Sequence, residues 1–282
     1  MRQTMSGNNL LRAGSRMDLV RCLVSEGDRI FTLARARELA GEAGISDGYL
    51  RQALHHLART GWVIRLRKGI YAISSAVPGS APVHEFEIAM SLVKPAAISH
   101  WSALSHHGLT EQVPGMVFVL TTTDASVPRL RDAEAKHGGG IFGVGDVSFR
   151  FVQVKPERFF GTVNAWIGEA RVKITDPERT LLDGLNMPQY CGDFANVLHA
   201  FRVRGASLDI ERIVDYALRL DAATAKRLGW VLEKQGIAYS KLKRLAALPI
   251  KGYRKLDPKG PRRGPTNSRW MIQENLPGKV NA

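Results

Sequence analysis

The chain of 282 residues has only two cysteines, Cys22 and Cys191, which lie far apart in the sequence. This scarcity excludes a disulfide framework and favours a reducing compartment, so we expect a cytoplasmic protein. No segment approaches the roughly 18 uncharged apolar residues that a membrane helix needs. Residues 1–14 lack the apolar core of a secretory signal. The remaining composition, 44% hydrophobic and 23% charged, is ordinary for a globular protein of about two domains.

Acidic side chains are also scarce, because 26 of them face 40 lysines and arginines, which gives a net charge of +14. The excess is uneven. Residues 1–75 carry a net +6, residues 76–200 carry −3 and residues 201–282 carry +11. A basic surface attracts polyanions and releases their counterions, so nucleic acid is the leading partner class.

Patterns that carry catalysis or bind metals are missing as well. The sequence has no Cys-x-x-Cys pair, and His100 and His107 on one helix would lie about 10.5 Å apart along its axis, too far to chelate one ion. Cys191 and His199 are too distant on one helix to act as nucleophile and base. We therefore expect no enzymatic activity, no metal and no cofactor.

The first quarter of the chain has the order of a winged helix-turn-helix. Apolar periodicity predicts helices over residues 15–26, 33–43 and about 46–59, with Ser46 or Asp47 capping the third. Gly44 suits the end of the second helix. Residues 62–73 alternate apolar and polar side chains about a Lys-Gly turn, which predicts a β-hairpin.

The third predicted helix has an apolar stripe, formed by Leu50, Ala53, Leu54 and Leu57, that must face a core. Its other face has no acidic residue and consists of side chains that donate hydrogen bonds or stack: Tyr49, Arg51, Gln52, His55, His56 and Arg59.

This composition predicts that the third helix enters the major groove of double-stranded DNA. Arg51 and Gln52 are the candidates for base edges, because Arg pairs with guanine and Gln with adenine. Arg65, Arg67 and Lys68, at the tip of the hairpin, are candidates for phosphate contacts. The alternatives are a helical domain whose positive face serves only solubility and a protein-docking module.

The rest of the chain is expected to be mixed α/β with a helical C-terminal half, so the fold class is α+β. Predicted strands cover residues 116–122, 148–154 and 166–174, and predicted helices cover 83–93, 99–109, 193–203, 209–220, 222–235 and 239–248. Residues 125–145 suggest a loop or frayed hairpin, and Gly138–Gly140 lacks the Gly-Lys-Ser/Thr of a phosphate loop. Thr175 or Asp176 is expected to cap a helix that follows, with Pro177 in its first turn and Glu178 three residues after Thr175 as in a capping box.

We expect a winged-helix domain over residues 1–76, a linker over 77–83, an α/β domain over 84–249 and a basic tail over 250–282. The tail could bind DNA phosphates, tRNA or an acidic partner through Arg262, Arg263, Arg269 and Trp270. The equally weighted alternative is a docked segment with Trp270 in the core.

Several ordered segments carry a family resemblance: RLRKGIYAI (65–73), ISHWSALSHHGLTEQ (98–112), VFVLTTT (117–123) and ITDPERTLLDGLNMPQYCGD (174–193). Together they resemble the AbiEi-type antitoxins of type IV toxin–antitoxin systems. The resemblance implies that the winged helix binds inverted repeats in its own promoter and represses that promoter. We expect two chains to bind there as a pair, from a protein that can be monomeric in solution. It also implies that the second domain counteracts a toxin of the nucleotidyltransferase fold.

Two other hypotheses remain open from the residues alone. One is a stand-alone winged-helix regulator whose second domain senses a ligand. The other is a toxin-binding or RNA-binding interaction protein whose winged helix has lost its DNA specificity.

Overall fold

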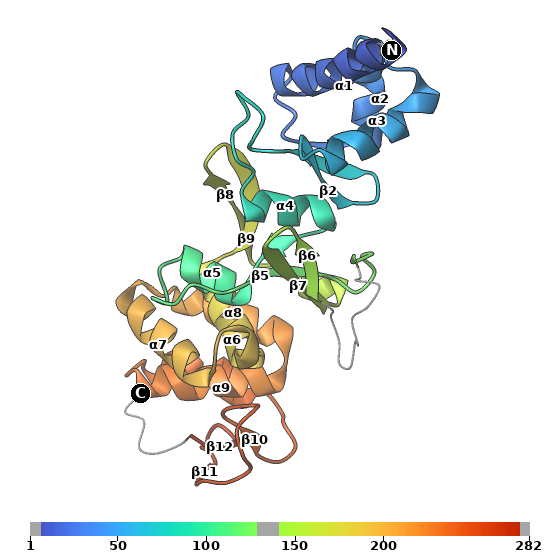
Figure 1. Ribbon diagram of the computed structural model, residues 1–282. Coiled ribbons are helices and arrows are strands. Elements are labelled where there is room, and N and C mark those ends of the chain that lie inside the picture. The colour runs from blue at the N-terminus through green and yellow to red at the C-terminus, as the bar shows by residue number, and fades with distance from the viewer. Residues whose placement is uncertain (1–6, 129–140, 277–282) are drawn as a thin grey trace. The chain divides into compact units, whose positions relative to one another are not determined.

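The computed structural model describes residues 7–128 and 141–276, and the chain divides into two compact units, Met1–Leu92 and Val93–Ala282 (Figure 1). Within the described residues, no helix is both long and apolar enough to cross a membrane. The first unit contains α1 (Gly7–Ser25), β1 (Ile30–Thr32), α2 (Leu33–Ala40), α3 (Asp47–Arg59), β2 (Val63–Arg67), β3 (Ile70–Ile73) and α4 (Glu85–Leu92).

The turn between α2 and α3 is set by glycine and by capping. The Thr32 hydroxyl accepts a hydrogen bond from the Arg35 amide at 3.1 Å and starts α2. Beyond α2, Gly44 adopts φ +65°, and the Ile45 amide donates to the Ala40 carbonyl at 2.8 Å, which is the Schellman pattern expected for a terminating glycine. Ser46 holds the N-cap position of α3 without a side-chain cap bond.

The hairpin β2–β3 is joined by β1, so the wing is a three-stranded antiparallel sheet in the order β1-β3-β2. Its inner side chains, such as Phe31, Val63 and Ile73, pack with the stripe of α3 and with α1 and α2 in one core. The predicted winged helix-turn-helix is therefore the observed fold of this part of the chain.

The first unit extends further than the domain boundary expected at residue 76, because α4 packs with it. Arg29 at the start of the wing forms an ion pair with Glu87 of α4 at 3.0 Å. Residues 77–83 were expected to be the linker between the domains. The contacts between residues instead divide the chain between Leu92 and Val93.

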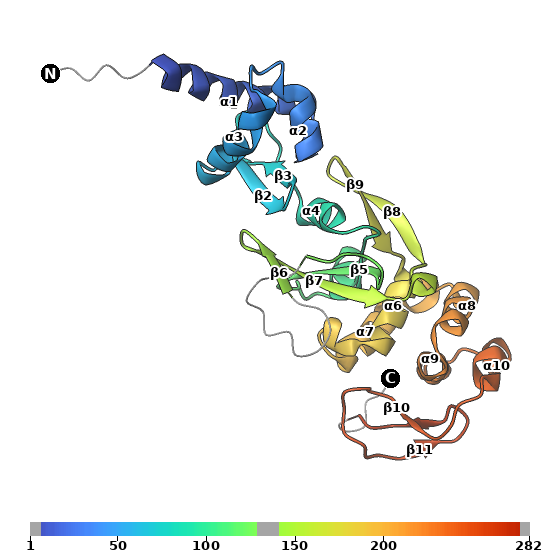
Figure 2. The same cartoon turned by 90° about the vertical axis from the view of Figure 1, so that its right-hand side faces the viewer.

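The second unit begins with a mixed six-stranded sheet in the order β6-β7-β5-β4-β9-β8, in which β5–β7 and β4–β9 are parallel (Figure 2). Its strands are β4 (Ala97–Ile98), β5 (Val117–Thr122), β6 (Ile141–Val144), β7 (Val147–Val154), β8 (Thr162–Ile167) and β9 (Ala170–Thr175). The short helix α5 (His100–His106) follows β4.

One expectation for this sheet was wrong in detail. Residues 166–174 are not one strand, because the chain turns at Gly168, which has φ +57°, and β8 and β9 pair as a hairpin. Trp166 lies near this turn with 70% of its surface exposed. In the segment 125–145, β6 pairs with β7, while Gly138–Gly140 lies outside the described residues.

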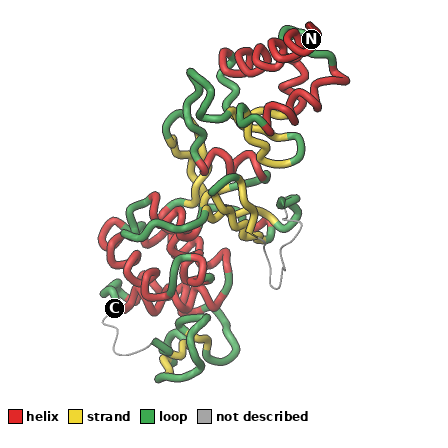
Figure 3. The backbone as a smooth tube through the Cα atoms, in the orientation of Figure 1, coloured by secondary structure: helices red, strands yellow, loops and turns green. Residues whose placement is uncertain are grey.

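The helical half follows the sheet as predicted. It consists of α6 (Pro177–Asn186), α7 (Phe194–Arg204), α8 (Ile210–Leu220), α9 (Ala222–Lys234) and α10 (Tyr239–Ala247), which share one apolar core. After α10 the chain is mostly loop, with a small sheet of β10 (Arg254–Lys255), β12 (Ile272–Gln273) and β11 (Thr266–Asn267) (Figure 3). Trp270 in this segment is fully buried in the same core, so the described part of the tail is a docked segment.

Candidate nucleic-acid interface

The exposed face of α3 contains four of the six side chains expected there to contact DNA. The stripe of Leu50, Ala53, Leu54 and Leu57 is buried against the core, and this fixes the rotation of the helix. As a consequence Arg51, Gln52, His55 and Arg59 are exposed to solvent. Arg51 and Gln52 lie near the N-terminal end of the helix, the end that contacts base edges in helix-turn-helix proteins.

Tyr49 and His56 lie on the border between this face and the core. Both are half-buried, and the Tyr49 hydroxyl accepts a hydrogen bond from Arg16 of α1 at 3.2 Å. Burial, helped by the charges of Arg16, Arg59 and His55, lowers the pKa of His56, which favours its neutral form. Arg16 is a candidate contact that sequence reasoning missed, because its place beside Tyr49 depends on the packing of α1 on α3.

The wing places two of its three basic side chains in solvent. Arg65 and Lys68 are exposed, whereas Arg67 is half-buried, and its buried Nε has no hydrogen-bond partner among the described residues. A register shift between Arg65 and Arg67 marks a bulge in the β2–β3 pair. Such bulges re-aim side chains.

Most carboxylates of the first unit form ion pairs with cations outside this face. Arg35 of α2 forms ion pairs with Glu26, Asp28 and Glu38, and Arg37 forms one with Asp47 at 2.5 Å. Within the described residues, none of the cations on the α3 face and the exposed wing forms an ion pair with a carboxylate; these cations are Arg51, Arg59, Arg65 and Lys68. This surface therefore presents uncompensated positive charge, which suits a polyanionic ligand.

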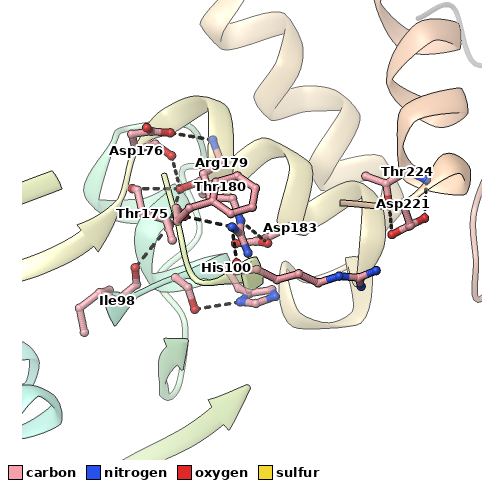
Figure 4. A network of polar contacts seen from close by, with 12 residues as sticks. Ile98, His100, Thr175, Asp176, Arg179, Thr180, Asp183, Asp221 and Thr224 are labelled. Carbon is pink, nitrogen blue, oxygen red and sulfur yellow. Dashed lines mark hydrogen bonds and ion pairs between the residues drawn. The ribbon is translucent and has the colours of Figure 1, made fainter. Parts of the chain in front are cut away.

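The second unit contains a different polar cluster, built on the start of α6 (Figure 4). Arg179 is 1% exposed and donates to Asp183 at 2.9 Å and to the carbonyls of Arg158 and Phe160 at 2.8 and 3.0 Å. The Thr175 and Thr180 hydroxyls bond one another at 2.7 Å. Most of these groups satisfy one another inside the protein, so this cluster acts as a structural network.

The capping box predicted for α6 does not form. Asp176 caps the helix by accepting from the Arg179 amide at 2.8 Å, and its other oxygen accepts from the Tyr216 hydroxyl at 2.9 Å. Glu178 turns away from the cap and instead accepts from Arg204 and from the Asp209 amide, each at 3.2 Å. Glu178 therefore joins α6 to the start of α8.

The histidines and cysteines that sequence reasoning considered for chemistry are dispersed. His100 is fully buried, with Nδ1 2.9 Å from the Ser99 hydroxyl, and burial lowers its pKa. His107 bonds the Thr175 carbonyl at 2.7 Å. Burial raises the pKa of the Cys191 thiol, whereas His199 is exposed. No group of three or more potential ligands in the described part of the chain is arranged to hold a metal.

The C-terminal candidates separate into two kinds. Arg262 and Arg263 are exposed, and Arg269 is exposed while it pairs with Glu233 of α9. Of the two alternatives for Trp270, the docked one is observed, because the ring is buried against Gly229 and its Nε1 donates to Glu233 at 2.8 Å.

The sequence of the winged helix matches a known protein family. Residues 25–74 match the family described as "Transcriptional regulator, AbiEi antitoxin". This segment is similar to the AbiEi antitoxin regulators. The resemblance seen in the sequence is thus confirmed for these residues.

Beyond the AbiEi segment, the comparisons show the fold alone. The structure is similar to the crystal structure of the RV2827C protein from Mycobacterium tuberculosis, with a TM-score of 0.66 at 16% sequence identity. The similarity covers 92% of this chain and 90% of that one, so both units have counterparts in a solved structure. No curated protein sequence is significantly similar to this chain.

Proposed function

We propose that the chain is a repressor of its own operon, which binds double-stranded DNA through α3 and the wing. The observation that carries the proposal is the surface without carboxylate partners formed by Arg51, Arg59, Arg65 and Lys68. Arg51 and Gln52 read base edges in the major groove, and the wing cations bind phosphates on either side. Inverted repeats accommodate two chains, one on each half-site.

A gel shift on the upstream promoter tests this proposal. We expect specific binding at least about 1,000-fold tighter than binding to a shuffled duplex of the same length at the same salt. Because cations alone bind any duplex, equal affinity for the promoter and the shuffled duplex would contradict sequence-specific repression.

We further infer that the chain is the antitoxin of a nucleotidyltransferase-fold toxin encoded beside it. The support is the AbiEi match of residues 25–74, whose family consists of antitoxin regulators. The second unit is a separate compact body with its own core, which is what a second activity independent of DNA binding requires.

Co-expression with the neighbouring toxin gene tests this second role. The full-length double variant Arg51→Ala, Gln52→Ala should lose repression and still restore growth, because both substitutions are exposed and lie in the first unit. Growth arrest despite normal levels of the wild-type chain would contradict an antitoxin role. Arrest with the double variant alone would mean that neutralisation requires DNA binding.

A further inference from the structure

Positive charge is concentrated at the end of the second unit. Residues 239–274 contain ten basic and two acidic side chains, a net charge of +8 within 36 residues. The exposed cations lie on α10 and on the segment that follows it: Lys241, Lys243, Arg244, Lys251, Arg254, Lys259, Arg262, Arg263 and Arg269. A charge of this density on a surface favours a polyanion.

This basic segment has a fixed position. Trp270 anchors it so closely to α9 that a Cβ on Gly229 would lie 2.0 Å from the indole ring. The indole of Trp230 donates to Glu274 at 2.7 Å, and Arg227 of α9 donates to the Lys255 carbonyl at 3.0 Å. The cations are therefore held by a folded scaffold, which lowers the entropy that a ligand must remove on binding.

An exposed aromatic ring lies on the same basic segment. Tyr239, at the start of α10, is 43% exposed, and the guanidinium of Arg269 lies 5.2 Å from its ring centroid. Glu233 holds Arg269 in this position through an ion pair, and Lys243 is one turn further along α10. Arg269 and Glu233 also line a shallow hollow together with residues 266–268.

We propose that this surface, named here the Tyr239 platform (Tyr239, Lys243, Arg262, Arg263 and Arg269), binds single-stranded nucleic acid. An unpaired base stacks on the Tyr239–Arg269 pair, while the neighbouring phosphates contact the remaining cations. Single strands suit the site better than duplexes, because the bases of a duplex are already stacked and gain little from an exposed ring. This ligand is distinct from the promoter duplex of the proposed function.

Fluorescence anisotropy with the full-length protein tests the proposal. The probes are a mixed-sequence RNA of about 16 nucleotides, the DNA of the same sequence, and its duplex. Tyr239→Ala should weaken single-strand binding by roughly 5- to 150-fold, the effect of losing one stacked base, whereas Tyr239→Phe should stay within about twofold. Arg21→Ala, which removes an exposed cation of the winged helix that pairs with Asp18, is the matched control and should leave single-strand binding unchanged. Arg51→Ala should weaken duplex binding more than single-strand binding.

A second variant tests the phosphate contacts without touching the ring. The double variant Arg262→Ala, Arg263→Ala should reduce the slope of log K against log salt by about 1.4, because each contact contributes about 0.7 on a single strand. RNA that binds more tightly than DNA would identify RNA as the ligand, and equal binding would support recognition through base and phosphate alone.

Three outcomes would overturn the proposal. The first is equal affinity of Tyr239→Ala and the wild type for the single strand, with both proteins folded. The second is equal affinity of the Arg51→Ala variant for the single strand and the duplex. The third is the absence of single-strand binding at low salt, which would leave an acidic protein as the ligand of this surface.

Discussion

The two units of this protein keep their charges in different places. In the first unit, the buried side chains among the described residues are all apolar, from Leu19 to Leu92. In the second, the interior also contains His100, Glu178, Arg179 and Lys226. The comparison indicates that the charged side chains of the first unit lie at its surface, where a ligand can reach them. Many charged side chains of the second unit lie inside it and stabilise the fold.

The reason lies in how each core is assembled. Three helices and a small sheet close the first core with matching apolar stripes, so no polar group has to be enclosed. The second unit joins a sheet to a helical bundle, and the junction buries backbone carbonyls of Arg158 and Phe160 that need donors. Arg179 supplies those donors and is balanced by Asp183.

The largest effect is expected from breaking this buried network. Arg179→Ala should lower the free energy of unfolding by about 3–5 kcal/mol, because it leaves Asp183 and two carbonyls without a partner. The matched control Arg37→Ala removes an exposed pair with Asp47 and should cost less than about 1 kcal/mol. Urea denaturation of both variants measures the difference, and equal losses would break the comparison between the units.

The converse holds for ligand binding. Arg51→Ala should weaken operator binding by roughly 1–3 kcal/mol and relax the preference at one base pair, while stability stays within about 0.5 kcal/mol. Arg21→Ala is the control, because this exposed cation of α1 pairs with Asp18 at 2.8 Å. An equal loss on operator and random duplexes would show that Arg51 touches only phosphate.

Sequence reasoning succeeded where the periodic spacing of apolar residues determines the structure. The stripe of Leu50, Ala53, Leu54 and Leu57 defined both the core and the exposed face of α3, since one excludes the other. It failed where contacts come from distant residues. The capping-box spacing at Thr175 and Glu178 gave no sign that the Glu178 carboxylate would accept from the backbone amide of Asp209. The Lys/Arg/Pro/Gly-rich composition of the tail could not decide whether Trp270 was buried.

A smaller effect is expected from the buried histidine. Burial lowers the pKa of His100, and the charge of Arg179 adds to this shift while that of Asp183 opposes it. Below pH 6.5 the histidine is therefore protonated more readily in the unfolded chain than in the folded chain. Between pH 6.5 and 5.5 this one group should remove about 1 kcal/mol of stability.

The variant His100→Asn isolates this effect, because asparagine tolerates the positive φ of 49° at this position. His107 contributes in the same direction and Asp176, whose pKa burial raises, in the opposite one, and both remain in the variant. Urea denaturation at both pH values should show a shallower pH dependence for the variant. Parallel curves for the two proteins would mean that His100 takes up its proton equally in the folded and the unfolded chain.

The smallest effect concerns Arg67, which combines the features of both units because it is basic, half-buried and on the wing. Its buried Nε has no partner among the described residues, so the guanidinium is free to turn its outer nitrogens toward a phosphate. Arg67→Ala should weaken binding to every duplex alike and reduce the slope of log K against log salt by about 1. The exposed Arg65→Ala serves as the reference for a wing phosphate contact. If Arg67→Ala leaves the slope unchanged and lowers stability instead, Arg67 is a packing residue, and burial rather than charge decides its role.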